Sequence, residues 1–162
     1  MPNFKRFCLA AAMFAAASAT QAQVAVKHIQ TEKAGIASGV WVGDLFYLSG
    51  QTASPITPAD PVKGTPADFG DTKAQAANIF AKIQKLLQDQ GLDMKDVVKM
   101  TVFLGADPKT GKMDFAAMNS EYAKYFGTKD QPNKPARSAV QVANLVSPTA
   151  LLEIEVIAAK GK

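Results

Sequence analysis

The sequence has little of the chemistry on which metal sites and disulfides depend. Its 162 residues include one cysteine, Cys8, and one histidine, His28. A structural zinc site usually takes four ligands drawn mainly from Cys and His side chains. His28 has no such partner in the chain and is expected to be an ordinary surface residue, so the composition argues against a metal site.

The chain also lacks an apolar run long enough to span a bilayer. Lys5 and Arg6 precede an apolar run, 7–19, of about a dozen residues, whereas a spanning helix needs roughly 20. A basic start, a short apolar stretch and small residues before a cut at Thr20-Gln21-Ala22 are typical of a secretory signal peptide. We therefore expect 1–22 to be a signal peptide, with a cut after Ala19 as the alternative.

Removal of the expected signal peptide, 1–22, would change the composition of the mature protein. It would take away Cys8, leaving no disulfide, thiolate nucleophile or cysteine metal ligand. Removing Lys5 and Arg6 from the 18 basic residues leaves 16 against 14 acidic ones, a balance that lends no support to nucleic-acid binding. We expect one domain, 23–162, that is periplasmic or secreted and has no stable membrane anchor.

Short apolar runs separated by turn residues predict the strands. They cover residues 24–30, 40–42, 45–48, 97–104, 137–145 and 151–159. Gly43-Asp44 between two of these runs is a hairpin signal, and the four prolines within 52–70 predict a loop. With a helix on either side of 97–104, the order becomes β-β-β-α-β-α-β-β. This order indicates an α+β domain with a single mixed β-sheet and two helices on one face.

Periodic apolar residues predict the two helices. The first has one apolar face made of Ala76, Ile79, Phe80, Ile83, Leu86 and Leu87, and the second has Phe115, Met118, Tyr122 and Phe126 on one side. Thr72 and Gln75 fit a capping box at the start of the first helix, and Gly91 fits its end. Gly127 is expected to end the second helix.

Alternation in the last two strands predicts which side chains face the helices. The expected set is Ser138, Val140, Val142, Leu152, Ile154, Val156 and Ala158. The opposite face would then carry Arg137, Ala139, Gln141 and Ala143 with Leu151, Glu153, Glu155 and Ile157. That face mixes charged and apolar residues, which favours its being covered by another subunit.

Several segments resemble the RidA/YjgF family, and the resemblance runs from about Gly43 to Ala159. The matching pieces are Ser49-Gly50-Gln51, the run 96–104, Asn119 with Tyr122, Pro135-Ala136-Arg137-Ser138-Ala139-Val140 and Leu152-Glu153-Ile154-Glu155. The specific feature is an arginine at a strand start, followed at a fixed distance by Glu-Ile-Glu in the next strand.

The resemblance implies a chorismate-mutase-like subunit assembled as a homotrimer, with a cleft for small carboxylates between neighbouring subunits. In the deaminase branch, the residue matched by Arg137 holds the carboxylate of 2-aminoacrylate-like enamino or imino acids. The residue matched by Glu153 handles water, and the products are a 2-oxo acid and ammonia. The chain departs from this pattern at Ala139, where the family has a cysteine, and at Ile36, where it has a tyrosine.

The residues themselves suit this chemistry, which is that of a 2-iminobutanoate/2-iminopropanoate deaminase-like hydrolase. An iminium carbon is already electrophilic, so its hydrolysis needs no cofactor, only a placed water, a proton acceptor and an anchored substrate. The guanidinium of Arg137 can grip a carboxylate with two parallel hydrogen bonds. Glu153 can accept a proton from water, and Asn119 with Ser49-Gly50-Gln51 can help close the pocket.

Spacing along the last two strands bears on assembly. If these strands form an antiparallel pair, Arg137 and Glu153 lie roughly 20 Å apart at about 3.4 Å per residue. One small substrate cannot bridge that distance, so the site is expected to combine Arg137 of one chain with Glu153 of a neighbour, and the monomer is expected to be inactive.

Simpler interpretations remain open for each residue. Arg137 taken alone fits a solvated strand-edge arginine, Glu153 fits an exposed strand residue, and Asn119 fits a surface amide. The alternative function is a non-catalytic binding protein that uses the same cleft for small carboxylic acids. Export favours this alternative, because reactive enamines are expected mainly where pyridoxal-dependent enzymes operate, in the cytoplasm.

Overall fold

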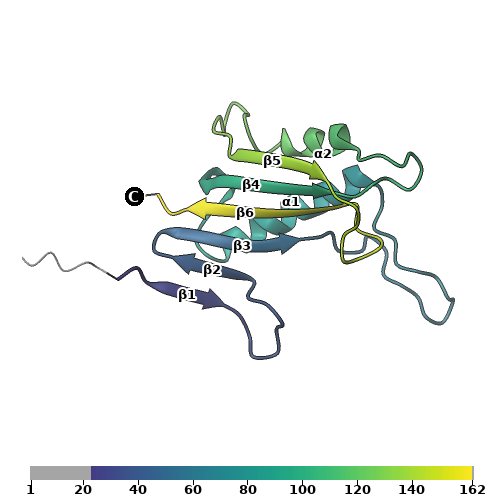
Figure 1. Cartoon of the computed structure of the whole chain (residues 1–162), viewed down its shortest axis with the longest axis horizontal. Coiled ribbons are helices and arrows are strands. Elements are labelled where there is room, and N and C mark those ends of the chain that lie inside the picture. Colours follow the sequence, from purple (N-terminus) through teal and green to yellow (C-terminus); the bar gives the residue numbers. More distant parts are fainter. Residues whose placement is uncertain (1–22, 162) are drawn as a thin grey trace, which may run out of the picture.

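The computed structural model describes residues 23–161, and the proposed signal peptide, 1–22, lies outside them. The strands are β1 (Val26–Ile29), β2 (Gly39–Val42), β3 (Leu45–Gln51), β4 (Val97–Leu104), β5 (Ala136–Gln141) and β6 (Leu152–Ala159). The helices are α1 (Thr72–Gln88), α2 (Phe115–Tyr122) and the short 3-10 helix η1 (Met94–Asp96). The expected order of strands and α-helices is confirmed (Figure 1), and η1 is an addition to it.

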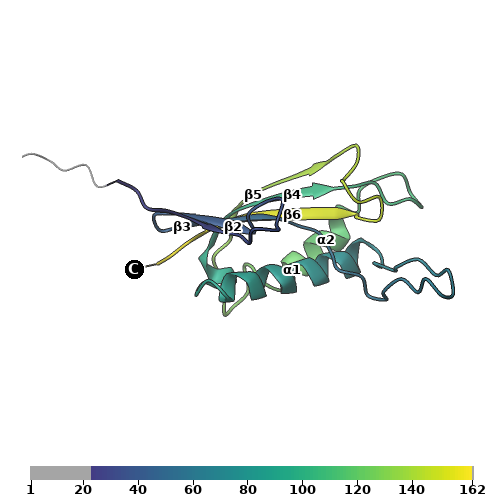
Figure 2. The same cartoon turned by 90° about the horizontal axis from the view of Figure 1, so that it is seen from below.

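One six-stranded sheet runs in the order β1-β2-β3-β6-β4-β5. β4 and β5 are parallel, whereas the other neighbouring strands are antiparallel, so the sheet is mixed as expected. Both helices cover one face (Figure 2). This is the α+β arrangement, one mixed sheet with two helices on one face, that the sequence predicted.

The last two strands are not paired with each other, as the spacing estimate had assumed. β4 lies between β5 and β6, and the chain crosses from one to the other through residues 142–151. β6 takes the central place because Leu152, Ile154, Val156 and Ala158 are all buried under the helices. β5 is left at the edge of the sheet.

The residues of β6 that were predicted to face the helices are buried, as expected. For β5 the prediction was wrong, because the opposite set of residues faces the helices. Arg137 lies beside the fully buried Met100 of β4 and therefore points toward the helices. Ser138 lies on the opposite face, where its hydroxyl is 3.3 Å from the Lys99 ammonium. A shift of one residue in the alternation moves every side chain of a strand to the opposite face of the sheet. On β5 the parallel pairing with β4 determines which residues face the helices.

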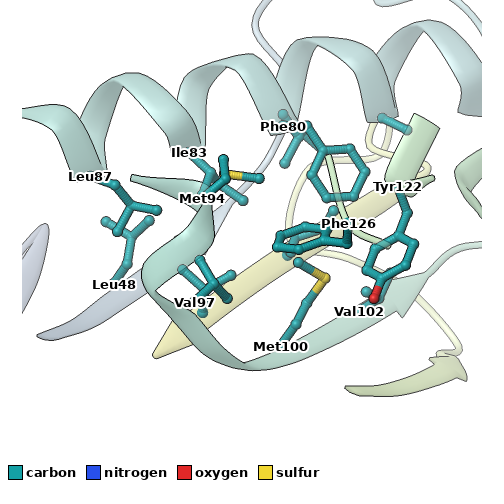
Figure 3. Close-up of a cluster of buried hydrophobic side chains, with 14 of the residues drawn as sticks. Leu48, Phe80, Ile83, Leu87, Met94, Val97, Met100, Val102, Tyr122 and Phe126 are labelled. Carbon is teal, nitrogen blue, oxygen red and sulfur yellow. The ribbon is translucent and has the colours of Figure 1, made fainter. Parts of the chain in front are cut away.

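The core lies between the sheet and the two helices (Figure 3). Ile83, Leu87 and Phe80 of α1 are buried in this core. The ring of Phe80 lies edge-on to that of Tyr122 in α2, with ring centroids 6.4 Å apart. Tyr122 in turn stacks on Phe126, with centroids 4.8 Å apart. These aromatic contacts hold α2 against α1, and they position Tyr122 beside β5.

The start of α1 differs from the predicted capping box. The N-cap is Asp71, whose carboxylate accepts a hydrogen bond from the backbone N–H of Ala74. Gln75 is buried instead, and its amide donates to the Thr149 carbonyl at 3.0 Å and accepts from the Leu151 N–H at 2.9 Å. Gln75 therefore anchors the crossing segment that leads into β6.

Replacing Gln75 by leucine keeps the side-chain volume but leaves the polar groups of Thr149 and Leu151 without their partner. Buried polar groups left unpaired cost about 1–3 kcal/mol. We predict that Gln75→Leu lowers the free energy of unfolding by about 2 kcal/mol, measured by urea denaturation at a fixed protein concentration. Lys73→Leu, on the exposed side of the same helix, serves as the control, and an equal loss in both variants would contradict the anchoring role.

Candidate functional site

Arg137 is the second residue of β5 and points beneath the sheet edge toward α2. Its Nη2 donates a hydrogen bond to Oδ1 of Asn119 at 3.0 Å. The side chain reaches α2 because Arg137 lies in register with Met100 on the helix-facing side of the sheet. Two of the residues that the sequence predicted for the site are thus in direct contact.

Two aromatic rings of α2 flank the guanidinium. Its Cζ lies 4.1 Å from the ring centroid of Tyr122 and 5.6 Å from that of Phe115. Phe115, Asn119 and Tyr122 are spaced four and three residues apart, which places them on one face of α2. The sequence predicted Phe115 only as an apolar helix position and Tyr122 as an apolar position that also matches the family pattern with Asn119, and the spacing of all three was already a signal of a shared face.

The positive charge of Arg137 is only partly compensated. Its Nη1 is buried and has no hydrogen-bond partner among residues 23–161. Arg137 also takes part in none of the three ion pairs found within this range. Burying a charged group without a partner is costly, so this guanidinium is suited to receive an anion.

Tyr122 contributes its ring rather than an ionised hydroxyl. Burial raises the pKa of Tyr122 above its ordinary value, and the nearby charge of Arg137 opposes this shift without cancelling it. The phenol therefore stays protonated at neutral pH. Its role beside Arg137 is that of a neutral π face, an arrangement that attracts cations.

Glu153 lies on the other face of the sheet, close to the backbone of β3. It pairs in register with Phe103 of β4, on the face away from the helices. A methyl group placed on Gly50 would overlap Oε1 of Glu153 and come within 2.9 Å of its Cδ. Glycine at position 50 is what permits the carboxylate to rest against this strand.

Ser49 and Gly50 occupy an irregular part of β3. The register with β6 shifts between Leu48 and Gln51, which indicates a β-bulge of the kind that redirects side chains near binding sites. The Ser49 hydroxyl donates to the Ala37 carbonyl at 2.7 Å, and the Gln51 amide donates to the Ser49 carbonyl at 2.8 Å. The bulge thereby ties the segment before β2 to the strand that supports Glu153.

A pocket of about 370 Å³ opens beside this bulge. Its lining consists of Ile29, Gln30, Thr31, Ala34, Ile36, Ser38, Ser49, Gly50 and Gln51. Ile36, the position at which the family pattern has tyrosine, thus lies in the same pocket wall as Ser49-Gly50-Gln51. Arg137 and Asn119 do not line this pocket.

The predicted site residues therefore form two separate groups within one chain. Arg137 and Asn119 lie on the helix side of the sheet, whereas Glu153 lies on the opposite side near Gly50. Arg137 is level with Met100 and Glu153 with Phe103, and β4 separates their strands. At about 4.8 Å per strand and 3.4 Å per residue, their Cα atoms are roughly 14 Å apart, which replaces the estimate of 20 Å.

The two groups offer different interactions to a ligand. Arg137 with Asn119 offers hydrogen-bond donors to an anion, and Glu153 offers a proton acceptor. Among residues 23–161 no three or more His, Cys, Asp or Glu side chains are grouped so that they can hold a metal ion.

Comparison with known proteins identifies the family. The sequence pattern of the family described as Endoribonuclease L-PSP matches residues 29–160. A RutC family protein of Haemophilus influenzae is 39% identical over 138 residues, which cover 82% of this chain and 95% of the relative. The chain belongs to this family, RidA/YjgF. The match contains every residue predicted for the site.

Relatives with more specific names include a 2-iminobutanoate/2-iminopropanoate deaminase of Salmonella typhimurium. It is 35% identical over 139 residues, covering 83% of this chain and 98% of the relative. Among solved structures, yeast Mmf1 superposes with a TM-score of 0.63 at 32% identity, covering 85% of this chain and all of that one. The RidA/YjgF family thus includes deaminases as well as members that carry only a family name.

The contact between Gly50 and Glu153 can be tested by a double-mutant cycle. Gly50→Ala inserts a methyl group into the space of the carboxylate, which is the far end of a flexible side chain and can move aside, so the cost stays below the about 1–3 kcal/mol typical of overpacking in a core. We predict a loss of less than about 1 kcal/mol in the free energy of unfolding for Gly50→Ala alone, and no loss in the Glu153→Ala background. Urea denaturation of the four proteins measures the coupling, and strictly additive losses would place Glu153 elsewhere.

Proposed function

We propose that this RidA/YjgF protein hydrolyses small 2-imino and 2-enamino acids to 2-oxo acids and ammonia. The observation that carries the proposal is the partly buried Arg137, which is oriented by Asn119 and Tyr122 and forms no ion pair with an acidic side chain among residues 23–161. A guanidinium held in this way matches a planar carboxylate. The relative named as a 2-iminobutanoate/2-iminopropanoate deaminase supports the same chemistry.

The proposed reaction begins when the substrate carboxylate binds Arg137, which leaves the adjacent C2 of the imine exposed to water. A 2-enamino acid first becomes the 2-imino acid by gaining a proton at C3 and losing one from nitrogen. Glu153 accepts a proton from water as the water oxygen bonds to C2 and passes it to the imine nitrogen, giving a neutral carbinolamine. Glu153 then takes the hydroxyl proton as the C2=O bond forms and delivers it to the nitrogen as the C2–N bond breaks, so that ammonia leaves and the carboxylate of Glu153 is restored. Base catalysis of this kind contributes about 10²–10⁴-fold.

The proposed site requires two chains. Arg137 and Glu153 of one chain lie on opposite faces of the sheet, and a three-carbon or four-carbon acid cannot reach both. A cyclic assembly, which we propose to be a homotrimer, brings the Arg137 side of one subunit against the Glu153 side of the next. The small-molecule carboxylate would then lie in the cleft between neighbours.

The first test concerns turnover. An amino acid oxidase generates the imino acid in place, and release of the 2-oxo acid is followed with and without the protein. We predict acceleration by the wild type, its loss in Arg137→Ala, and at least a tenfold decrease in Arg137→Lys, because lysine lacks the planar pair of donors. Lys134→Ala, a nearby exposed cation, should keep full activity, and equal rates for wild type and Arg137→Ala would contradict the proposal.

The alternative function is binding without turnover. The replacement of the family tyrosine by Ile36 favours it, because a substrate contact is then missing. Saturable binding of pyruvate, measured by calorimetry and lost in Arg137→Ala, without any acceleration of imine hydrolysis, would select this alternative over the deaminase.

The second test concerns the shared site. Arg137→Ala and Glu153→Ala should each be inactive alone, yet subunits of the two kinds mixed by co-refolding should complement one another. With equal, random mixing in a cyclic assembly, about one quarter of the clefts contain an intact Arg137 and an intact Glu153. We predict about one quarter of wild-type activity, and no recovery would mean that each chain contains its own complete site.

Export remains part of the proposal. Among residues 23–161, no helix combines the length and apolar character needed to cross a membrane. The proposed signal peptide rests on the basic start and apolar run within residues 1–22. N-terminal sequencing of the protein recovered from fractionated cells tests it, with a start near Gln23 in the periplasmic or secreted fraction as the expected result.

A further inference from the structure

The pocket beside Gly50 is lined mainly by apolar surface. Ile36 projects from the segment before β2 with 73% of its surface exposed, and Ile29 and Ala34 lie near it in the same wall. An isoleucine exposed to this extent in the single chain has apolar surface available for a ligand.

The polar residues of the lining are largely occupied by local hydrogen bonds. The Ser38 hydroxyl donates to the Ile29 carbonyl at 2.8 Å, and the Ser49 hydroxyl donates to the Ala37 carbonyl. The Gln51 amide donates to the Ser49 carbonyl. None of the nine lining residues carries a charge, so the pocket has no group to pair with a charged ligand side chain.

Gly50 connects this pocket to the carboxylate proposed to activate water. It lines the pocket, and it is also the residue against which Glu153 rests. A substrate whose C2 is attacked by water near Glu153 would therefore have the neighbouring space of the pocket open to its side chain. The volume of about 370 Å³ is more than a methyl group requires.

We propose that this pocket selects 2-imino acids with aliphatic side chains larger than a methyl group, and that Ile36 is the residue that determines this preference. The inference rests on the proposed function, because it concerns the side-chain end of a substrate whose carboxylate is held by Arg137 of the neighbouring subunit. Burial of apolar atoms against Ile36 favours leucine-like substrates, whereas an acidic side chain would lose its hydration without gaining a partner.

The test compares imino acids derived from alanine, leucine and glutamate, generated by amino acid oxidases. For the wild type we expect kcat/KM to be at least tenfold higher for the leucine-derived imine than for the glutamate-derived one, as apolar pockets discriminate by about tenfold or more. Ile36→Ser should lower kcat/KM for the leucine-derived imine about tenfold. The same substitution should change kcat/KM for the alanine-derived imine by less than about twofold. Val62→Ser, at a valine 94% exposed in the loop 52–70, is the matched control and should change neither.

The outcomes separate the two proposals. Turnover of the alanine-derived imine without a preference for the leucine-derived one, or an equal loss on both in Ile36→Ser, would overturn the inference and leave the proposed function intact. If the wild type turns over none of the three imines, the proposed function fails. Calorimetry with 4-methyl-2-oxopentanoate and pyruvate then tests whether the pocket prefers the branched acid. Tighter binding of the branched acid that is lost in Ile36→Ser supports the inference, and equal binding overturns it.

Discussion

The interaction on which the site depends is the contact of Arg137 with α2. A guanidinium partly removed from water requires compensation, and here it donates one hydrogen bond to Asn119 and lies over the π face of Tyr122. Both partners are electrically neutral, so the charge remains available. The ring of Tyr122 is itself fixed by Phe80 and Phe126 in the core, which makes the orientation of Arg137 a consequence of core packing.

The mixed topology explains why the two halves of the site face away from each other. β5 pairs only with β4, in parallel, and this register turns Arg137 toward the helices. β6 lies in the centre of the sheet, where its alternate residues are buried and Glu153 must point to the uncovered face. A chain built in this way has a guanidinium on one face of its sheet and a carboxylate on the other, and the proposed cyclic assembly would join them into repeated sites.

The bulge of β3 shapes the part of the candidate site that contains Glu153 and the neighbouring pocket. An irregular register at Ser49-Gly50 brings glycine backbone under the Glu153 carboxylate, and the hydrogen bond from Ser49 to Ala37 ties the strand to the segment that carries Ile36. Differences among RidA/YjgF relatives in that segment would therefore alter the pocket wall without disturbing Arg137. By contrast, Ala139, which replaces the family cysteine, is partly buried against the core and adds no reactive group.

The predictions that succeeded from sequence rested on local patterns and on the family motif. The apolar period of α1 and the order of the elements required no knowledge of distant contacts. The capping box at Thr72 was wrong because Gln75 forms hydrogen bonds with residues more than 70 positions away. Such a partner has no signature in the neighbouring sequence.

Sequence alone thus determined which elements form, because helix and strand periodicity depend on neighbours along the chain, and its motifs identified the family. Only the tertiary structure decided the place of β4 between β5 and β6, the face to which Arg137 points, and the contact of Glu153 with Gly50. A partly exposed edge strand such as β5 has similar residues on both sides, so its alternation is compatible with either phase. Pairing with Met100 and packing against α2 select one phase, and both are contacts between residues far apart in the chain.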